Sequence, residues 1–274
     1  GAAFAEWITD MNPVPFDFSG RHVFVAGGSS GINFGIAQGF ARAGARVSLI
    51  SRSADKVEAA VAQLQALGAE AFGQAADVRQ PEAVAAAFEA AAARFGPIDV
   101  LVSGAAGNFV APALGMSAKG FKTVVDIDLN GTFHVLRAGF EHLRRPGASV
   151  INISAPQAFN PTKLQAHVCA AKAGVDMLTR VLAMEWGPEG VRVNSIVPGP
   201  IADTEGIRRL APTPEALQRM TQSVPLQRMG RVEEIADMAL FLASQHAAFV
   251  TGAIMVVDGG SSLAGGRDYS GALT

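Results

Sequence analysis

The sequence predicts an α/β fold in which one parallel sheet of about seven strands is covered by helices on both faces. Short apolar runs rich in Val, Ile and Ala alternate with longer segments of helical period along most of the 274 residues. Strands that are apolar throughout must be buried on both faces, which suits a parallel sheet between two helix layers. With 49% hydrophobic and 17% charged residues, the chain can bury one large core. We therefore expect a single doubly wound domain.

Each element is expected from a local pattern. Strands are predicted at residues 22–26, 46–51, 69–75, 98–103, 149–154, 191–197 and 253–257. Helices are predicted at residues 32–43, 54–66, 81–95, 117–144, 164–186 and 232–244. Asp55 is expected to cap the second helix and Pro81 to begin the third. Gly44, Gly68 and Gly96 each follow a predicted helix, where a left-handed residue commonly ends it.

The predicted domain covers residues 19–262. Residues 1–18 are interpreted as an N-terminal leader or remnant followed by an extension, and Met11 could be the natural start. Residues 263–274 form a C-terminal tail. The segment 201–225 combines several prolines with charged residues and interrupts the alternation, so we expect a substrate lid beside a ligand crevice.

Composition argues against several classes of protein. The formal net charge is −2 and no block of like charges occurs, which disfavours nucleic-acid and membrane-surface partners. No apolar run is long enough to span a bilayer, and the N-terminus lacks the basic region of a secretory signal. The single cysteine, Cys169, fits a reducing compartment, and no spacing of His, Cys and carboxylates predicts a metal site. The expected protein is cytoplasmic and binds small molecules.

A glycine-rich turn follows the first predicted strand and opens the first helix. It runs from Gly27 to Ile32 and reads G-G-S-S-G-I. Glycine lets a backbone turn sharply beside a pyrophosphate, and the free N–H groups of a helix N-terminus attract its charge. The hydroxyls of Ser29 and Ser30 could add donors. The pattern alone also fits an ordinary tight turn, but its place in the first strand–helix unit favours the dinucleotide site of a Rossmann domain.

Basic residues after the second strand indicate which dinucleotide is bound. That strand ends in Ser51-Arg52-Ser53, and Lys56 follows one helical turn later. No Asp or Glu stands there to accept a ribose 2′-hydroxyl, whereas cationic groups suit a 2′-phosphate. The sequence therefore favours NADPH over NADH, although Arg52 and Lys56 could instead be ordinary solvated charges.

Taken in order, these motifs and later ones resemble the short-chain dehydrogenase/reductase family from Ser19 to Ser262. The later motifs are Asp77-Val78, Ser103 to Gly107, Lys172 in a helix, Arg192 to Pro200, and Val250 to Gly260. The resemblance implies that Asp77 and Val78 contact adenine, that Ala105 lines the cofactor, and that the 198–204 loop meets the nicotinamide. The turn and the resemblance together predict these cofactor-binding residues: Gly27, Ser29, Ser30, Gly31, Ile32, Arg52, Lys56, Asp77, Val78, Ala105, Lys172, Pro198, Gly199, Ile201 and Thr204.

The sequence departs from that family at the reacting groups. Aligned on Lys172, the family's Tyr falls on Val168 and its Ser on Ala155, so both hydroxyls are missing. The family's helical Asn is replaced by Asp128, and the third glycine of the turn by Asn33. In carbonyl reduction the developing alkoxide needs a proton from a group beside it. The chain is therefore poorly suited to ketone or alcohol chemistry.

Within the family, the sequence is most similar to the 2,4-dienoyl-CoA reductases, particularly the peroxisomal type. The stretches that carry this similarity are 105–109, 121–128, 183–188 and 199–206. That branch also lacks the Tyr and the Ser and carries the Asp. The resemblance implies NADPH-dependent reduction of a 2,4-dienoyl-CoA to a 3-enoyl-CoA in unsaturated fatty-acid degradation. Asp128 and Lys172 would be catalytic, holding the water that protonates carbon, unless Asp128 makes only a local salt bridge and Lys172 lies on the surface.

The same resemblance implies an acyl-CoA partner and a homotetramer. A CoA thioester carries phosphates, so basic groups are expected at the mouth of the site. The predicted substrate contacts are Arg52, Arg79, Arg208 and Arg209 at the phosphates and Phe109 beside the acyl chain.

Two other functions stay open. The protein could reduce another carbonyl or enoyl substrate, with His167 or the single tyrosine, Tyr269, as a substitute acid. It could also be a catalytically silent NADP-binding protein, since loss of the Tyr and Ser is what such a protein would show. His167 stands next to the vacant Tyr position, where a structural histidine is the simpler interpretation. Gln157 occupies the place where the mitochondrial type has a tyrosine.

Overall fold

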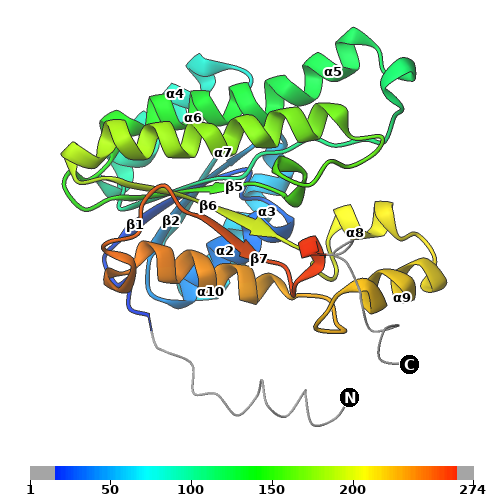
Figure 1. Ribbon diagram of the computed structural model, residues 1–274. Coiled ribbons are helices and arrows are strands. Elements are labelled where there is room, and N and C mark those ends of the chain that lie inside the picture. The colour runs from blue at the N-terminus through cyan, green and yellow to red at the C-terminus, as the bar shows by residue number, and fades with distance from the viewer. Residues whose placement is uncertain (1–15, 264–274) are drawn as a thin grey trace.

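The structure has the parallel α/β architecture that the sequence predicts (Figure 1). This computed structural model describes residues 16–263, apart from the side chains of residues 209 and 210. Within this range one seven-stranded parallel sheet has the order β3-β2-β1-β4-β5-β6-β7. Its strands are β1 His22–Ala26, β2 Arg46–Ser51, β3 Ala71–Ala75, β4 Val100–Ser103, β5 Ser149–Ile153, β6 Arg192–Pro198 and β7 Ile254–Val257. The predicted positions of Met11 and Tyr269 lie outside the described residues.

Two helix layers cover the sheet, as its apolar strands require. The α-helices between residues 16 and 263 are α2 Gly31–Arg42, α3 Ala54–Ala66, α4 Pro81–Phe95, α5 Ala118–Val125, α6 Gly131–Gly139, α7 Ala166–Trp186, α8 Glu205–Leu210, α9 Pro214–Ser223 and α10 Val232–Ala243. Helices α2, α3 and α10 pack on one face and α4, α6 and α7 on the other (Figure 1). In the second layer Phe88 of α4 stacks on Phe24 of β1, with ring centroids 4.1 Å apart. The single domain therefore rests on two apolar cores, one on each side of the sheet.

The helix predicted over 117–144 is present as a continuous helical run from residue 118 to residue 142, but the helix type changes along it. That stretch contains α5, a π-helical turn at Asp126–Asn130, α6 and a short 3₁₀ turn at Phe140–His142. The hydroxyl of Thr132 donates a hydrogen bond to the backbone oxygen of Asp128 at 2.7 Å. A π turn holds one residue more than an α turn, so it rotates the side chains around it out of the α-helical register, and such turns are frequent at functional sites. This turn carries Asp128.

The predicted bounds of α2, α3, α4, α7 and α10 lie within two residues of the observed ones, and one predicted cap is wrong. Ser53, and not Asp55, is the N-cap of α3, because its backbone is extended and its hydroxyl accepts a hydrogen bond from the backbone N–H of Lys56 at 3.4 Å. Asp55 lies in the first turn, where its charge suits the positive end of the helix. Pro81 begins α4 as predicted. The left-handed glycines are confirmed, with φ of +90°, +87° and +77° at Gly44, Gly68 and Gly96.

The segment 201–225 contains two short helices, α8 and α9, which lie beside the end of β7 and away from the two main helix layers (Figure 1). Thr204 and Thr213 cap them, each accepting a backbone hydrogen bond from the residue three positions later. No residue of α9 is buried. The segment is thus a surface structure added at the edge of the sheet.

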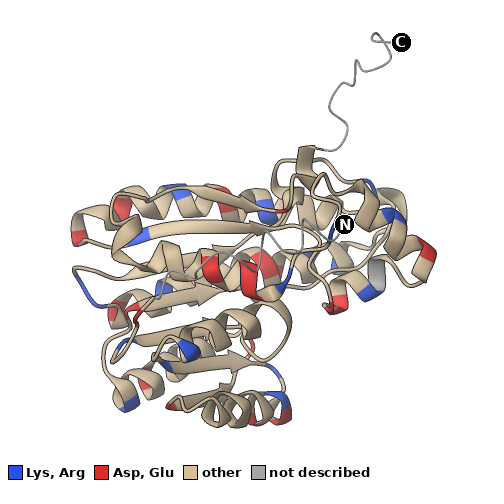
Figure 2. Cartoon of the chain, turned by 90° about the horizontal axis from the view of Figure 1, so that it is seen from below, with Lys and Arg blue, Asp and Glu red and all other residues tan. Residues whose placement is uncertain are grey.

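Charges of both signs are distributed over the molecule. Figure 2 shows Lys and Arg interspersed with Asp and Glu over the elements on that side. Of the helices in residues 16–263, none combines the length and the apolar character needed to cross a membrane. The N-terminal part of the fold begins before Ser19, because Phe18 is buried and its ring packs edge-on against Phe40, with centroids 4.9 Å apart.

Candidate active site

The topology brings the predicted site residues to one edge of the sheet. The strand order reverses between β1 and β4, so the connections that leave these two neighbouring strands run to opposite faces. In doubly wound sheets this switch point opens a crevice outside the carboxyl ends of the strands. The glycine-rich turn follows β1 at this edge, Gly104 follows β4, and Ser154 follows β5.

The glycine-rich turn has the backbone that a phosphate cradle needs. Gly27 has φ of +75°, and a Cβ added there would lie 2.8 Å from the backbone nitrogen of Ala105. Gly31 has φ of +58° and open space where a side chain would stand. Ser30 is the N-cap of α2, and its side chain makes no capping hydrogen bond. The first N–H groups of α2 and the Ser30 hydroxyl are therefore suited to a phosphate group.

Asn33, which replaces the third glycine of the turn, joins α2 to the end of β4. Its Nδ2 donates a hydrogen bond to the backbone oxygen of Gly104 at 2.7 Å. A Cβ at Gly104 would lie 2.0 Å from Oδ1 of Asn33. In the usual motif the third glycine lets the helix pack closely against the neighbouring strand. Here Asn33 stands at that position, and Gly104 after β4 leaves the space for its side chain.

The predicted adenosine-binding residues lie at the ends of β2 and β3. Arg52 and Lys56 are exposed, and within the described residues no hydrogen bond or ion pair holds the side chain of either. Arg79 forms a bidentate ion pair with Asp77, with Nη2 2.6 Å from Oδ2 and Nε 3.0 Å from Oδ1. The guanidinium of Arg79 holds the pKa of Asp77 below its ordinary value. Arg79 is thus engaged by the carboxylate predicted to meet adenine, whereas Arg52 is free for a phosphate.

Asp128 and Lys172 meet as an ion pair in the interior. Their side chains are 1% and 7% exposed, and Nζ of Lys172 lies 3.7 Å from Oδ2 of Asp128. Oδ1 of Asp128 accepts a hydrogen bond from the backbone N–H of Gly107 at 2.7 Å, and Lys172 donates one to the backbone oxygen of Ile153 at 3.0 Å. The structure thus joins the π turn, α7 and the segment after β4 around two opposite charges. Neither residue is a surface charge.

The charge of Asp128 is set by opposing effects. Burial raises the pKa of its carboxyl group, whereas the ammonium of Lys172 and the N–H of Gly107 lower it. Burial is the larger effect, so the pKa lies above the ordinary value for an aspartate. Oδ2 has no hydrogen-bond partner among the residues described. A carboxyl group of this kind is well placed to orient and polarise a small polar molecule.

The position of the missing hydroxyls is apolar. Val168 lies one helical turn before Lys172 on α7 and is buried. Ala155 precedes the short 3₁₀ turn Pro156–Ala158. Gln157 donates a hydrogen bond to Oε1 of Gln165 at 3.2 Å, so it takes part in an amide contact. Neither Val168 nor Ala155 can donate a proton to a substrate.

Two polar residues at the start of α7, Gln165 and His167, are buried, and Gln165 was not predicted as a site residue from the sequence. The ring of His167 is fully buried and lies edge-on to Phe109, with centroids 4.3 Å apart. Gln165, also buried, exchanges hydrogen bonds with the side chain of Asn108 and donates one to the backbone oxygen of Phe109 at 3.4 Å. In the sequence, His167 stood out only because it is next to the vacant Tyr position. No sequence pattern marked Gln165.

The predicted substrate residues lie on different elements. Phe109 is 40% exposed on the segment after β4. Arg208 is exposed on α8 and donates a hydrogen bond to the backbone oxygen of Asp203 at 3.1 Å. Arg209 follows in α8, and its side chain lies outside the described part of the chain. Within the residues described, no cluster of His, Cys, Asp and Glu could hold a metal ion.

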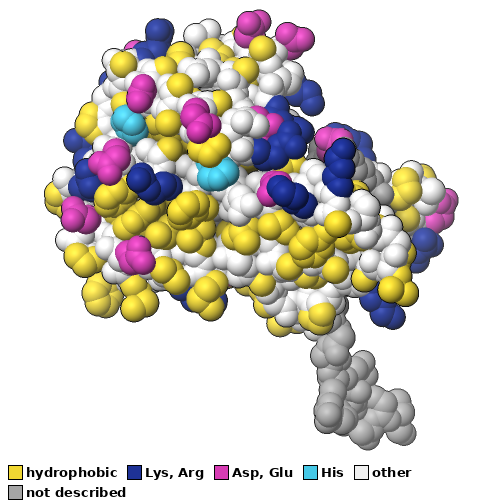
Figure 3. All heavy atoms as spheres, turned by 90° about the horizontal axis from the view of Figure 1, so that it is seen from above, with side chains coloured by type: hydrophobic (Ala, Val, Ile, Leu, Met, Phe, Trp, Pro, Cys, Tyr) yellow, Lys and Arg dark blue, Asp and Glu magenta, His cyan; other side chains and the backbone are white. Residues whose placement is uncertain are grey.

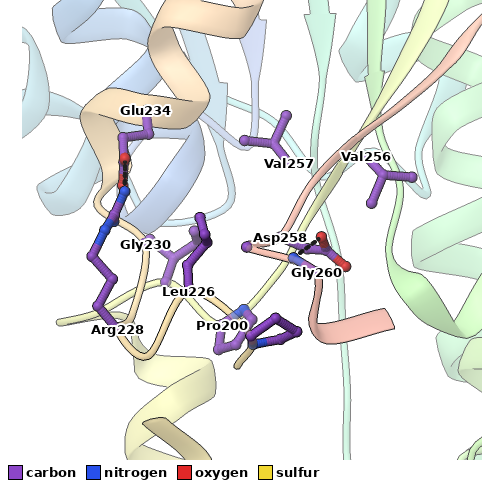
Figure 4. A pocket seen from close by; sticks show the side chains of 12 residues that line it. Pro200, Leu226, Arg228, Gly230, Glu234, Val256, Val257, Asp258 and Gly260 are labelled. Atoms are coloured by element: carbon purple, nitrogen blue, oxygen red, sulfur yellow. Dashed lines mark hydrogen bonds and ion pairs between the residues drawn. The ribbon is translucent and has the colours of Figure 1, made fainter. Parts of the chain in front are cut away.

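A cavity of about 520 Å³ lies beside the 198–204 loop (Figure 4). Its lining includes Pro200, Ile201, Leu226 and an ion pair between Arg228 and Glu234, with Nη2 2.6 Å from Oε1. Asp128 and Lys172 do not line it. The cavity therefore adjoins the base of the segment 201–225 and is separate from the buried ion pair.

Comparison with known proteins agrees with this geometry. Residues 26–262 match the family model described as "Enoyl-(Acyl carrier protein) reductase". A relative from Pongo abelii, named peroxisomal 2,4-dienoyl-CoA reductase [(3E)-enoyl-CoA-producing], is 46% identical over 90% of this chain and 86% of its own. The rat protein of the same name is 47% identical over 87% of this chain and 82% of its own.

A solved structure shares the fold over almost the whole chain. It is that of a short-chain type dehydrogenase/reductase from Mycobacterium ulcerans, which is 35% identical, with a TM-score of 0.86 over 94% of this chain and 95% of the other. The fold, the glycine-rich turn and the sequence similarity all indicate the same family. The chain therefore belongs to the short-chain dehydrogenase/reductase family, a family of nicotinamide-dependent oxidoreductases.

Proposed function

We propose that the protein is an NADPH-dependent 2,4-dienoyl-CoA reductase that forms a 3-enoyl-CoA in the degradation of unsaturated fatty acids. The observation that carries the proposal is the buried pair of Asp128 and Lys172 at a site where Val168 and Ala155 replace the hydroxyl groups of a carbonyl reductase. The names of the two relatives described above support the substrate.

The site suits proton transfer to carbon. Bound NADPH would supply a hydride to the δ-carbon of the diene, and the resulting negative charge spreads to the thioester oxygen. Backbone N–H groups near Phe109 stabilise that oxygen. Asp128 and Lys172 hold and polarise a water that protonates the α-carbon, and Lys172 also binds the nicotinamide ribose. Because water donates the proton to the α-carbon, this reaction does not require the missing phenol.

The assay for this function uses a short 2,4-dienoyl-CoA and NADPH, with absorbance followed at the cofactor and diene bands. We expect both bands to decay together and the product to carry its double bond at carbon 3. Turnover of a β-ketoacyl thioester without turnover of the diene would instead favour another carbonyl substrate. Tight NADPH binding with no turnover of either would favour a silent binding protein.

Arg52 should determine the choice of cofactor. We expect Arg52→Ala to raise the Kd for NADPH on the order of tenfold or more, because a charge-assisted hydrogen bond to the 2′-phosphate is lost. Affinity for NADH should stay unchanged. Titration of both cofactors by fluorescence measures the effect. Arg42→Ala, an exposed arginine at the other end of α2, is the matched control. An equal loss of affinity for both cofactors would contradict this role.

CoA recognition is proposed to involve Arg79, Arg208 and Arg209, with the segment 201–225 closing over the acyl chain. Phe109 borders that chain. Because Arg208, Arg209 and Phe109 would contact the acyl-CoA and not the dinucleotide, their replacement should raise KM for the acyl-CoA more than it changes NADPH affinity.

A homotetramer fits the apolar surface of the second helix layer. Figure 3 shows hydrophobic side chains gathered on this face. Exposed apolar residues on α6 and α7 of this layer and on the adjoining α5 are Phe121, Phe133, Met177, Val181 and Met184. Light scattering coupled to gel filtration measures the mass in solution.

We propose a cytoplasmic location for this protein, whereas the two relatives are named peroxisomal. Cell fractionation tests the location.

A further inference from the structure

His167 is a buried histidine without a hydrogen-bond partner in the described part of the protein. It lies in the first turn of α7, five residues before Lys172, and its ring is 0% exposed. Neither Nδ1 nor Nε2 has a partner among the described residues. Leaving a buried polar group unpaired costs about 1–3 kcal/mol. A buried imidazole without a protein partner is therefore expected to bind a ligand or an ordered water in the functioning protein. An apolar ring would fill the same space without this cost.

A second histidine shows what a structural role looks like in this fold. His22 is also 0% exposed, but both of its ring nitrogens are engaged. Nε2 lies 2.8 Å from the hydroxyl of Ser48, and Nδ1 lies 2.9 Å from the backbone oxygen of Gly96. His167 therefore differs from His22 in that neither of its ring nitrogens is bound by a described protein group.

The surroundings of His167 place it at the reacting end of the site. On one side its ring meets the edge of Phe109, the residue expected beside the acyl chain. Its helix, α7, also packs against the π turn that carries Asp128, and a charge on His167 would lower the pKa of that carboxyl group. Oδ2 of Asp128 is itself buried without a hydrogen bond, since Gly107 occupies Oδ1. Two buried groups that lack a hydrogen bond thus lie on two elements that pack together, α7 and the π turn.

One small molecule can satisfy both groups. An ionised carboxylate oxygen only accepts hydrogen bonds, whereas a neutral imidazole offers one donor and one acceptor. A thioester oxygen only accepts, so it cannot be the partner of Asp128. Water donates and accepts, and buried water typically makes about three hydrogen bonds to otherwise unpaired polar groups. The chemistry of the two groups therefore selects water.

We propose that His167 is a positioning residue that, together with Oδ2 of Asp128, holds the water which protonates the α-carbon of the substrate. This inference rests on the proposed function. The ring N–H donates to the water oxygen, one O–H donates to Asp128, and the other O–H points to the α-carbon. As the new C–H bond forms, that O–H bond breaks, and the N–H of His167 and the ammonium of Lys172 stabilise the hydroxide that remains. A proton from solvent then restores the water.

The test compares His167→Phe with His167→Gln. The Phe variant keeps a ring of similar size but has no polar atom, whereas the Gln variant keeps a donor and an acceptor. For the Phe variant we expect kcat for a 2,4-dienoyl-CoA to fall about tenfold or more, with NADPH Kd unchanged and the solvent deuterium isotope effect on kcat increased. The Gln variant should retain most of the turnover. The Tm of the Phe variant should change little, because no protein group loses a hydrogen-bond partner when the imidazole is removed.

His22→Phe is the matched control. It leaves Ser48 and Gly96 without their partner, so it should lower Tm while the enzyme that remains folded turns over normally. If His167→Phe instead loses Tm as His22→Phe does, or keeps the wild-type kcat and isotope effect, His167 is structural and the proposal is wrong. An inactive wild type on every dienoyl-CoA would overturn the proposed function and this inference with it. An active wild type with an unaffected Phe variant overturns the inference alone.

Discussion

Asp128→Asn should lower turnover of a 2,4-dienoyl-CoA by about 100-fold or more, while NADPH affinity stays near the wild-type value. Proton transfer by a positioned group contributes about 10² to 10⁴ in rate, and the amide can neither carry the charge nor polarise water as the carboxylate does. The Asn side chain still offers an oxygen to the N–H of Gly107, which the carboxylate binds at 2.7 Å, so the local fold should be preserved. Steady-state kinetics and cofactor titration separate the two effects.

Asp126→Asn is the control for this substitution. Asp126 belongs to the same π turn, but it pairs with Lys122 near the surface and takes no part in the site. Its replacement should leave kcat almost unchanged. Equal turnover of Asp128→Asn and wild type would refute the catalytic role of the carboxylate.

The same variant should also alter the pH dependence of stability. Burial raises the pKa of Asp128 in the folded protein, so the native state holds this proton at pH values where the unfolded chain has lost it. The stability of the wild type relative to Asp128→Asn should therefore fall as pH rises above the ordinary range of an aspartate. Tm measured for both proteins across that range checks the sign.

Lys172→Met should give the larger loss, with turnover reduced about 1,000-fold and NADPH affinity also weakened. Both results follow from its two proposed contacts, to the water and to the nicotinamide ribose. The variant leaves Asp128 buried without its counter-ion, and breaking a buried pair in this way costs about 3–5 kcal/mol. Kinetics, cofactor titration and urea denaturation measure the three effects.

The double variant Lys172→Met with Asp128→Asn isolates the ion pair. Removing both charges should recover much of the stability that Lys172→Met alone loses, because no uncompensated charge remains. Turnover should not recover. Lys122→Met, which removes the cation of the exposed pair with Asp126, should change stability little, since its side chain is 74% exposed. Recovery of turnover in the double variant would contradict a direct role for these groups.

Much of the fold was predictable because its signals are local. The α3 and α4 helices have the predicted bounds, since a helical run that begins at Pro81 and ends before Gly96 carries its own start and stop. The strand–helix alternation and the fold class are confirmed for the same reason. The π turn at Asp126–Asn130 was not predictable, because one extra residue in a helical turn hardly changes the hydrophobic period. The short helices α8 and α9 were missed because runs of six and ten residues offer only a short periodic pattern, and α9 buries no residue that would mark a core face.

By itself the sequence determined the fold class, the glycine-rich turn after the first strand and the absence of the two family hydroxyls, and it predicted Asp128 and Lys172 as the catalytic pair. These are properties of residue type and order. Only the tertiary structure decided that Asp128 and Lys172 meet at 3.7 Å in the interior, that Asn33 reaches Gly104, and that His167 is buried without a partner. Each of these contacts joins segments distant in the chain, and their distances and burial depend on how helices and strands pack, which residue order does not encode locally.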